Sequence, residues 1–334
     1  MIAKSKYVLI SVLIISFFSL ASNFRVFESY VSQTNIITEF NSNSFNSITG
    51  EKVISNDLFY PNITITAIPF SGVKANYLMQ EKQYFDALEV LNQSKNVNPF
   101  IYYNQSLKSK IFRALQVKDS ALYYGFQAYN GIPLNPVHFE NIAIILASND
   151  DGEELISQFL KVDHFDPQVY RILFASFLNL KDQSDERIKS IALNSLERFS
   201  DNKEITNLAL YVLYGLENVT ESYNLSDKAS ELYSSNKFQE AIELYKKAID
   251  LNPYDATFYE NIGMCFYQLK QYEDVILFFE QSLEKKTSSL GKAEFFIGLS
   301  SVNLGKLEEG CLFLHKSKSL NYESAYNAII KFCK

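Results

Sequence analysis

Apolar and polar side chains alternate with a helical period over residues 238–251. Apolar residues recur every three or four positions, so they share one face of a helix. This face holds Phe238, Ala241, Ile242, Tyr245, Ala248, Ile249 and Leu251. The opposite face holds Glu240, Glu243, Lys246, Lys247 and Asp250. Asn252-Pro253 ends the helix, because proline has no N–H and disfavours helix in the residue before it. A second, shorter helix precedes it, and the two are joined by a tight turn at residues 235–237.

The same pattern returns at a nearly constant spacing. Steps of 34 and 35 residues lead from Ala241 to Val275 and Gly310, and a step of 34 leads from Ala87 to Ala121. Small and aromatic residues accompany these positions in register. They are Ala75, Leu78, Tyr84, Leu91, Pro99, Ala128, Pro133, Gly263, Phe266, Tyr272, Phe279, Gly298, Gly305, Leu307 and Leu314. Small residues let the two helices of a repeat approach, and aromatic residues fill the space to the next repeat.

Residues 229–253 resemble a tetratricopeptide (TPR) unit through the order Ala241-x3-Tyr245-x2-Ala248-x4-Pro253. The resemblance implies an all-α fold, a TPR-like α-solenoid of antiparallel helix pairs. We expect two repeats in residues 66–134. We also expect a C-terminal TPR domain over residues 222–334, in which a helix at 325–334 covers the last repeat.

The stretch between these repeats lacks the signature but keeps helical periodicity. It predicts five amphipathic helices, so that residues 66–216 form one set of partly degenerate repeats. The expected helices span residues 137–147, 152–161, 167–180, 184–198 and 202–216. Five is an odd number, and residues 216–225 are too few and too polar to supply the missing partner. We therefore expect a break in the solenoid near residues 217–224.

Residues 7–24 carry no charge and are strongly apolar, which predicts one N-terminal hydrophobic helix. Residues 1–24 fit an uncleaved membrane anchor or a signal peptide with a small-residue cleavage site at Ser19-Leu20-Ala21. Both interpretations leave Lys4 and Lys6 inside and the chain after Arg25 outside the cytoplasm, because lysine and arginine favour the cytoplasmic side. The chain would then be held in a bacterial inner membrane or released into the periplasm. Residues 25–65 form a linker or loosely structured segment, whose first part can continue the helix.

Composition and charge favour a scaffold over an enzyme. The formal net charge of −7 argues against nucleic-acid binding, which needs a basic surface. Three histidines, His138, His164 and His315, share no ligand spacing, and His164 fits a polar loop before a helix capped by Asp166. No motif predicts catalysis, a metal or a cofactor. Of the three cysteines, Cys265 and Cys311 fall at buried repeat positions and are expected to be small core residues; a disulfide to Cys333 stays open.

The resemblance also implies a binding groove, because the first helices of TPR repeats line the concave face of the solenoid. The residues expected there are Tyr223, Ser226, Asp227, Ser230, Tyr233, Glu260, Asn261, Met264, Tyr267, Lys292, Phe295, Phe296 and Leu299. About half of them could instead pack between repeats. Some family members bind a C-terminal carboxylate through five polar positions, of which only Asn261 and Lys292 match, since Ser226, Ser230 and Phe296 occupy the others. An apolar or aromatic peptide or protein segment is the expected partner.

A second resemblance covers about residues 10–140. The apolar segment ending ASNFRVFESYVSQ, followed by FYPNITITAIPFSGVKANYLMQ and KDSALYYGFQAYNGIP, resembles the periplasmic TPR tail of bacterial O-antigen ligase or polymerase-like membrane proteins. This implies an accessory module of a surface-polysaccharide system as the alternative to a scaffold for protein partners. The chain lacks the multi-span membrane body of those proteins, so glycosyl transfer is not implied.

Overall fold

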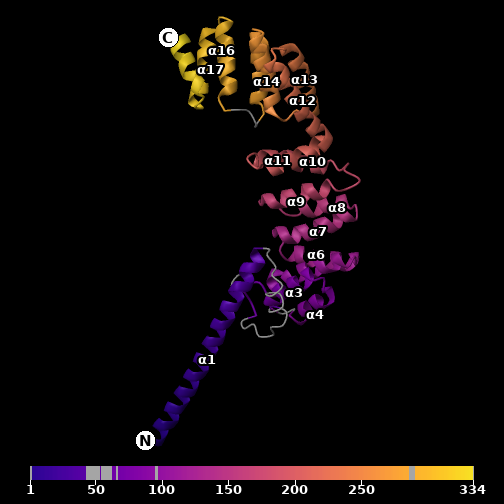
Figure 1. Cartoon of the computed structure of the whole chain (residues 1–334), viewed down its shortest axis with the longest axis vertical. Helices are drawn as coiled ribbons and strands as arrows, with labels where there is room; N and C mark the ends of the chain where they lie inside the picture. Colours follow the sequence, from indigo (N-terminus) through magenta and orange to yellow (C-terminus); the bar gives the residue numbers. More distant parts are fainter. Residues whose placement is uncertain are drawn as a thin grey trace. The chain divides into compact units, whose positions relative to one another are not determined.

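The chain folds as a succession of helices. The computed structural model describes residues 2–42, 53, 62–64, 67–94, 97–285 and 290–333. In these residues the regular elements are helices, mostly short and joined by tight turns (Figure 1), which confirms the predicted all-α, TPR-like solenoid preceded by an apolar helix. The chain divides into two compact units, residues 1–176 and 177–334. Each unit is described by itself.

Unit 1 pairs its helices along the chain. Its elements are α1 (Ile2–Asn41), α3 (Phe70–Gln80), α4 (Tyr84–Gln93), η1 (Pro99–Ile101), α5 (Tyr103–Ala114), α6 (Lys118–Gly131), α7 (Pro136–Ser148), α8 (Gly152–Leu160) and α9 (Pro167–Phe177). Helices α3 and α4 pack together, as do α5 and α6, and α7 and α8. Ala75, Ala87 and Ala121 are buried where the sequence predicts small residues between helices. The first two repeats therefore form as expected.

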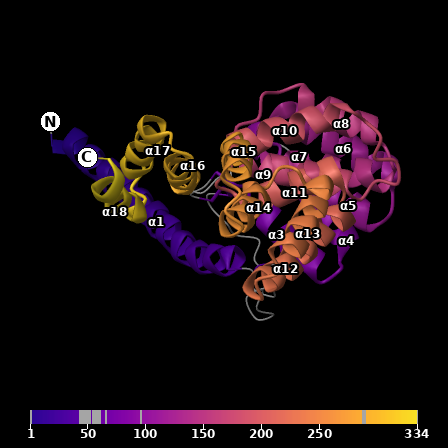
Figure 2. The ribbon, with the colours of Figure 1, turned by 90° about the horizontal axis from the view of Figure 1, so that it is seen from above.

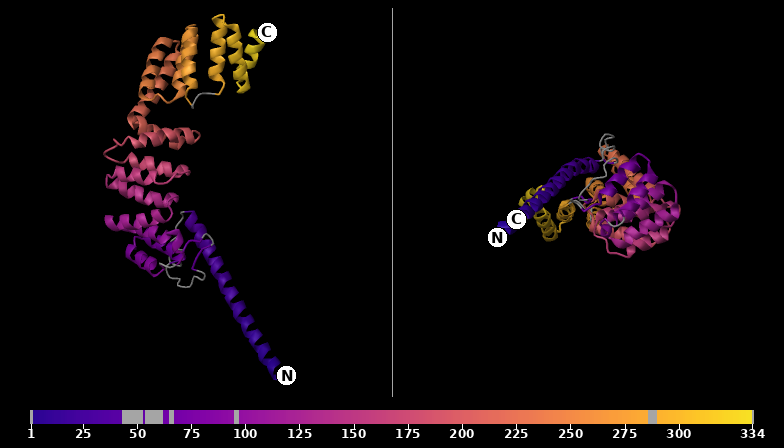
Figure 3. Two further views of the ribbon diagram at one scale, coloured as in Figure 1. Left: turned by 180° about the vertical axis from the view of Figure 1, so that it is seen from behind. Right: turned by 90° about the horizontal axis from the view of Figure 1, so that it is seen from below.

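Helix α1 is an uninterrupted rod of 40 residues (Figure 3). At 1.5 Å per residue it is about 60 Å long. Residues 8–39 are long and apolar enough to cross a membrane by length and composition. The helix runs through residue 24 to Asn41, as expected for the first part of the 25–65 segment. Most of the remaining linker, residues 43–52 and 54–61, lies outside the described residues.

The C-terminal end of α1 belongs to the core of unit 1. Ile36 is 6% exposed and packs in one apolar cluster with Phe70, Val73 and Tyr77 of α3. Burial raises the pKa of the Tyr77 phenol, and the nearby Glu39 carboxylate raises it further. The apolar first half of α1 is by contrast exposed along its length; Phe17, for example, is 71% exposed. The two halves of the helix therefore meet different surroundings.

Unit 2 continues the series of antiparallel helices. It contains α10 (Arg187–Arg198), α11 (Lys203–Tyr214), α12 (Leu216–Ser234), α13 (Phe238–Leu251), α14 (Ala256–Gln268), α15 (Tyr272–Leu283), α16 (Lys292–Asn303), α17 (Leu307–Ser319) and α18 (Glu323–Phe332). Each helix from α11 to α17 packs against the next one, and Figure 2 shows α16, α17 and α18 side by side in chain order. The core includes the predicted repeat positions Ala241, Val275 and Phe279, all fully buried. The terminal helix α18 packs on α17, as expected for a cap.

Residues 216–225, which the sequence predicted to be too few and too polar for a partner helix, form the first half of α12, and this helix runs unbroken across residues 217–224. Within the polar residues 216–225, Val219 and Ser222 are buried and lie one turn apart. Two buried side chains are thus enough to pack the first half of this helix against the protein. Helix α12 packs against both α11 and α13. Tyr254, after α13, also donates a hydrogen bond to the Leu196 carbonyl oxygen of α10. Helix α11 thus finds its partner in a helix that also opens the next repeat.

One backbone feature marks the repeats independently of their side chains. A residue with positive φ lies two positions after the end of the first helix in each of six helix pairs. These residues are Lys82, Gln116 and Asp150 in unit 1, and Asn236, Lys270 and Gly305 in unit 2. Their spacing is 34 residues within unit 1, and 34 and then 35 within unit 2. Helices α7 and α8 therefore form a third repeat in register with the first two, although the sequence there lacks the signature.

The cysteines depart from the expectation of simple core residues. Cys265 is buried and free, as predicted. Cys311 instead forms a disulfide with Cys333, with 5.6 Å between their Cα atoms. Cys311 lies on α17 and Cys333 directly follows α18, so the disulfide fastens the cap to the last repeat.

Candidate partner-binding site

The residues expected to line the groove fall on three first helices of repeats, α12, α14 and α16. Helix α12 carries Tyr223, Ser226, Asp227, Ser230 and Tyr233. Helix α14 carries Glu260, Asn261, Met264 and Tyr267. Helix α16 carries Lys292, Phe295, Phe296 and Leu299. On α14, Glu260 to Tyr267 span two turns, which places these side chains on one side of the helix.

These side chains differ in accessibility. Glu260 is fully buried and Phe296 is 9% exposed, so both act within the fold. Tyr223, Asp227 and Ser230 are exposed. The others are half-buried: Ser226, Tyr233, Asn261, Met264, Tyr267, Lys292, Phe295 and Leu299. Eleven of the thirteen predicted residues thus retain accessible surface.

An ion pair joins the second and third of these helices. Lys292 Nζ lies 2.9 Å from Glu260 Oε2, and the Lys292 side chain is 24% exposed. The ammonium group compensates the buried carboxylate, since a buried charge is costly unless paired. Lys292 is therefore engaged with the protein and is a poor candidate for binding a ligand carboxylate, in agreement with the mismatch seen in the sequence.

Aromatic rings fix the same two helices. The Tyr267 and Phe296 rings meet edge to face at 5.2 Å, and Phe296 stacks on Phe279 at 5.1 Å. Phe295 lies edge to face with Phe296 at 5.1 Å and at the same separation from Tyr322. These contacts hold the half-buried faces of Tyr267 and Phe295 in place, which limits the entropy they would lose on binding a partner.

Tyrosine hydroxyls on and beside this surface form hydrogen bonds. Burial, and then the Asp255 carboxylate, raise the pKa of the Tyr223 phenol to about 12. Burial likewise raises the pKa of Tyr245, whose hydroxyl lies 2.9 Å from Ser230 Oγ. Gln268 Nε2 donates to the Tyr233 hydroxyl at 3.2 Å. Such groups can recognise a polypeptide backbone, and the raised pKa values of Tyr223 and Tyr245 keep these two phenols protonated at neutral pH.

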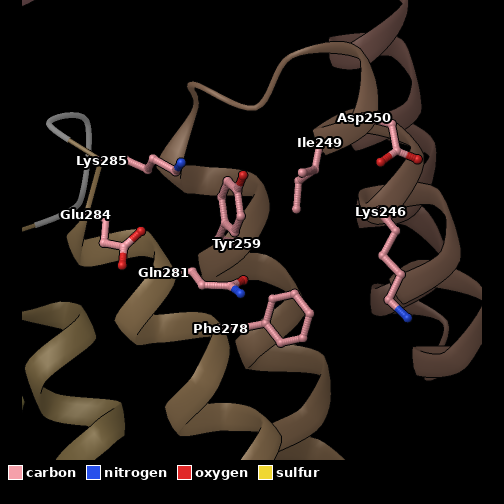
Figure 4. Close-up of a pocket in the computed structure, with 8 residues that line it drawn as sticks. All are labelled: Lys246, Ile249, Asp250, Tyr259, Phe278, Gln281, Glu284 and Lys285. Atoms are coloured by element: carbon pink, nitrogen blue, oxygen red, sulfur yellow. The ribbon is translucent and has the colours of Figure 1, made fainter.

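Sequence reasoning missed a hollow formed by α13, α14 and α15 (Figure 4). It is open and encloses about 490 Å³. Tyr259 lies in its middle, with an apolar floor completed by Ile249 and Phe278. The remaining lining residues are Lys246, Asp250, Gln281, Glu284 and Lys285. Two lysines and two carboxylates lie among these residues, so their charges cancel. The sequence gave no signal for a hollow, because it placed Lys246 and Asp250 on the solvent-facing side of a helix.

The histidines of unit 1 serve packing. His164 lies in the loop after α8, as expected, but its side chain is only 2% exposed and its ring lies 4.9 Å from that of Phe159. The expectation of a polar loop side chain is therefore wrong, although Asp166 does accept a hydrogen bond from the backbone N–H of Gln168 at the start of α9. Within the described residues, no group of three or more His, Cys, Asp or Glu side chains could hold a metal ion.

Comparison with known families adds an independent finding. The family model described as "TPR repeat" matches residues 229–270, which cover the last turns of α12, all of α13 and α14, and the turns between them. The chain contains a tetratricopeptide repeat. This TPR coincides with the segment whose small, aromatic and proline positions carried the resemblance. It includes one whole helix of the predicted groove, α14, and the end of another, α12.

Two similar proteins match about a third of the chain. The TPR repeat-containing thioredoxin TDX of Arabidopsis thaliana is 30% identical over 115 residues, which are 34% of this chain and 30% of that protein. Hsc70-interacting protein 1 of Drosophila melanogaster is 31% identical over 115 residues, with the same shares. The chain thus spans about 30% of the length of these relatives. The resemblance to O-antigen ligase-like tails stays a prediction.

Solved TPR structures are similar to this chain as well. The first TPR of Spaghetti (RPAP3), bound to the HSP90 peptide SRMEEVD, is 24% identical and covers 34% of this chain and 92% of its own, with a TM-score of 0.33. A tetratricopeptide repeat protein from Parabacteroides merdae is 12% identical and covers 93% of this chain and 97% of its own, with a TM-score of 0.28.

Proposed function

We propose that this chain is a non-catalytic TPR scaffold that binds a protein or peptide through the surface of α12, α14 and α16. The observation that carries this proposal is the set of half-buried apolar side chains on that surface, Met264, Tyr267, Phe295 and Leu299. Rigid aromatic and methionine side chains are the groups that bind apolar segments at protein interfaces. The relative named Hsc70-interacting protein 1 supports a role in protein interaction.

We further propose that the scaffold works on the extracytoplasmic side of a bacterial inner membrane. Two features support this location. Helix α1 is long and apolar enough to cross a membrane or to serve as a signal sequence. The disulfide between Cys311 and Cys333 is of a kind that persists in oxidising compartments and is rare in the cytosol of ordinary organisms.

Site-specific photo-crosslinking tests the binding surface. A photoreactive amino acid in place of Met264 or Leu299 should crosslink the partner in living cells. The matched control is the same amino acid in place of Leu277 on α15, which is 48% exposed and lies outside the proposed surface. Crosslinks from Met264 and Leu299 but not from Leu277 support the proposal. Equal crosslinks from Leu277, or none from the surface, would refute it.

Membrane fractionation with N-terminal sequencing tests the location. An intact Met1 in the membrane fraction identifies an anchor, and a new terminus at Ser22 in the periplasmic fraction identifies a cleaved signal peptide. The cleaved form supports the extracytoplasmic side, and the intact form supports attachment to the membrane. An uncleaved, soluble, cytoplasmic protein would overturn both interpretations of residues 7–24.

A further inference from the structure

The hollow formed by α13, α14 and α15 has an aromatic ring in its middle and a carboxylate on each of two opposite sides (Figure 4). The ring is that of Tyr259, which is 7% exposed. The two wall carboxylates are those of Asp250 on α13 and Glu284 directly after α15, and both residues are exposed. Burial raises the pKa of the Tyr259 phenol, and the Glu284 and Asp250 carboxylates are among the groups that raise it further. Both carboxylates therefore act on the same ring.

The lysines of the hollow do not pair with the wall carboxylates. Lys246 Nζ lies 3.8 Å from Glu243 Oε1, one turn earlier on α13. Lys285 Nζ lies 5.1 Å from the centre of the Tyr259 ring. In the part of the chain that the structure describes, no lysine or arginine forms an ion pair with either wall carboxylate. When Glu243 is counted, three carboxylates face two ammonium groups, and the lysine over the ring shows that the ring accepts a cation.

The direction of the helices adds to the negative potential in the hollow. Asp250 lies one residue before the end of α13, and Glu284 is the C-cap of α15. The C-terminal end of a helix carries a partial negative charge, which favours a cation and disfavours a carboxylate. Neither helix has a basic residue in its last turn. Tyr259 lies in the first turn of α14, whose positive end is capped by Asp255, which accepts from the backbone N–H of Thr257 at 2.9 Å.

We propose that this hollow binds an arginine side chain of a basic protein segment. A guanidinium can stack on the Tyr259 ring and direct its in-plane donors to a carboxylate on either side. The aliphatic part of the arginine side chain can lie on Ile249 and Phe278, and the Gln281 amide can bond to the backbone of the segment. The hollow shares no residue with the surface proposed on α12, α14 and α16, so it adds a second binding site to the scaffold.

The competing explanation is that Lys285 permanently fills the cation position and that the wall carboxylates only stabilise the fold. Asp250→Asn would then lower the melting temperature, and the hollow would take no second cation. A binding site predicts the opposite pattern. Lys285→Met should strengthen binding at least about threefold, because it frees the ring and removes a like charge. Asp250→Asn should weaken binding and leave the melting temperature unchanged or higher, since a carboxylate at a helix C-terminus is unfavourable.

Calorimetric titration of the full chain in non-ionic detergent tests the proposal. The probe is the peptide acetyl-Ala-Ala-Arg-Ala-Ala-amide, and its partner probe has citrulline, a neutral analogue of the same shape, in place of arginine. Asp250→Asn and Glu284→Gln should each weaken binding of the arginine peptide about tenfold, the effect of losing one charged hydrogen bond. Glu273→Gln is the matched control, because Glu273 is an exposed carboxylate on α15 outside the hollow, and this variant should keep the native affinity.

Spermidine, as a third probe, separates an arginine side chain from a free small cation. Tighter binding of the arginine peptide than of the citrulline peptide and spermidine supports the proposal if the two wall variants lose affinity and Lys285→Met gains it. Absence of binding by the native chain, equal binding of the two peptides, or tighter binding of spermidine would overturn it. Unchanged affinity in Lys285→Met, or a clear fall in the melting temperature of Asp250→Asn, would also overturn it. The crosslinking results at Met264 and Leu299 are independent of these outcomes.

Discussion

Replacing Gly310 by alanine tests whether close contact between helices defines the last repeat. A Cβ at this position would lie 2.6 Å from Val302 Cγ2, 2.8 Å from the Gly298 carbonyl oxygen and 2.9 Å from the Val302 nitrogen. Two of these three atoms belong to the backbone of α16, which cannot rotate away as a side chain can. Helices α16 and α17 must therefore move apart to admit one methyl group.

The size of the effect follows from two opposing contributions. Overpacking costs about 1–3 kcal/mol, and backbone contacts place Gly310→Ala near the upper end of that range. Alanine recovers about 1 kcal/mol because it is the better helix former. The net expectation is a loss of about 2 kcal/mol in local stability. This corresponds to roughly thirtyfold faster amide hydrogen exchange in α16 and α17 if exchange follows local opening.

Hydrogen exchange measured by mass spectrometry is the suitable assay, because repeat arrays need not unfold as one cooperative unit. Leu312→Ala is the control: it lies on the same helix, and Leu312 is 70% exposed, so its effect should stay within about 0.5 kcal/mol. Unchanged or slower exchange in Gly310→Ala would refute the reasoning. Helix propensity would then outweigh the contact with α16.

Three further changes test other features. Cys333→Ser removes the disulfide to Cys311, which should stabilise the folded state by about 3 kcal/mol because it restricts the unfolded chain. The variant should therefore show faster hydrogen exchange in α18. A reductant should have the same effect on the native chain and no further effect on the variant. His138 is 2% exposed and burial lowers its pKa, so its contribution to stability is complete above the ordinary pKa of about 6.5 and is lost as the pH falls below it. Melting curves at pH 7.5 and 5.5 should show this loss, and a smaller loss in His138→Gln. Lys292→Met removes the ammonium group that pairs with the buried Glu260 and should lower the free energy of unfolding by about 2 kcal/mol. This loss is smaller than for a fully buried pair because Lys292 is partly exposed. Urea unfolding of the chain measures the loss, and an unchanged midpoint would contradict the prediction.

The sequence predicted the helices because local and periodic signals agreed. Ala87, Ala121 and Ala241 share one register, and each is buried between two helices. The sequence predicted α7 and α8 as part of a degenerate set of repeats but not their register, because that register is preserved in the turn at Asp150 and not in the signature residues. The first half of α12 was not predicted because it is mostly polar. The structure buries only Val219 and Ser222 there, too few apolar residues for a periodic pattern.

The candidate site was only partly predictable. Helical period placed its residues on three first helices, but it could not separate Glu260 and Phe296, which are buried, from neighbours such as Met264. That distinction depends on contacts with the next helix. The disulfide was likewise hidden, because the distance between Cys311 and Cys333 depends on how α18 docks and not on their separation in the sequence.

Helix α1 has an exposed apolar first half and a second half that packs on the first repeat, and this division has a consequence for how the repeat is attached to a membrane. The buried residues of α1 begin at Ser29 and include Ile36, which packs on α3, whereas the expected cleavage site ends at Ala21. Cleavage would therefore remove the apolar half and leave the seat on α3 intact. Without cleavage, the continuous helix advances only about 8 Å from Phe24 to Ser29, the first buried residue. The continuous helix would then hold the first repeat at a fixed distance from the bilayer. A stiff connection of this kind limits the positions that the repeat can reach, and so it sets the effective concentration of the repeat for partners in the same membrane more narrowly than a flexible linker would.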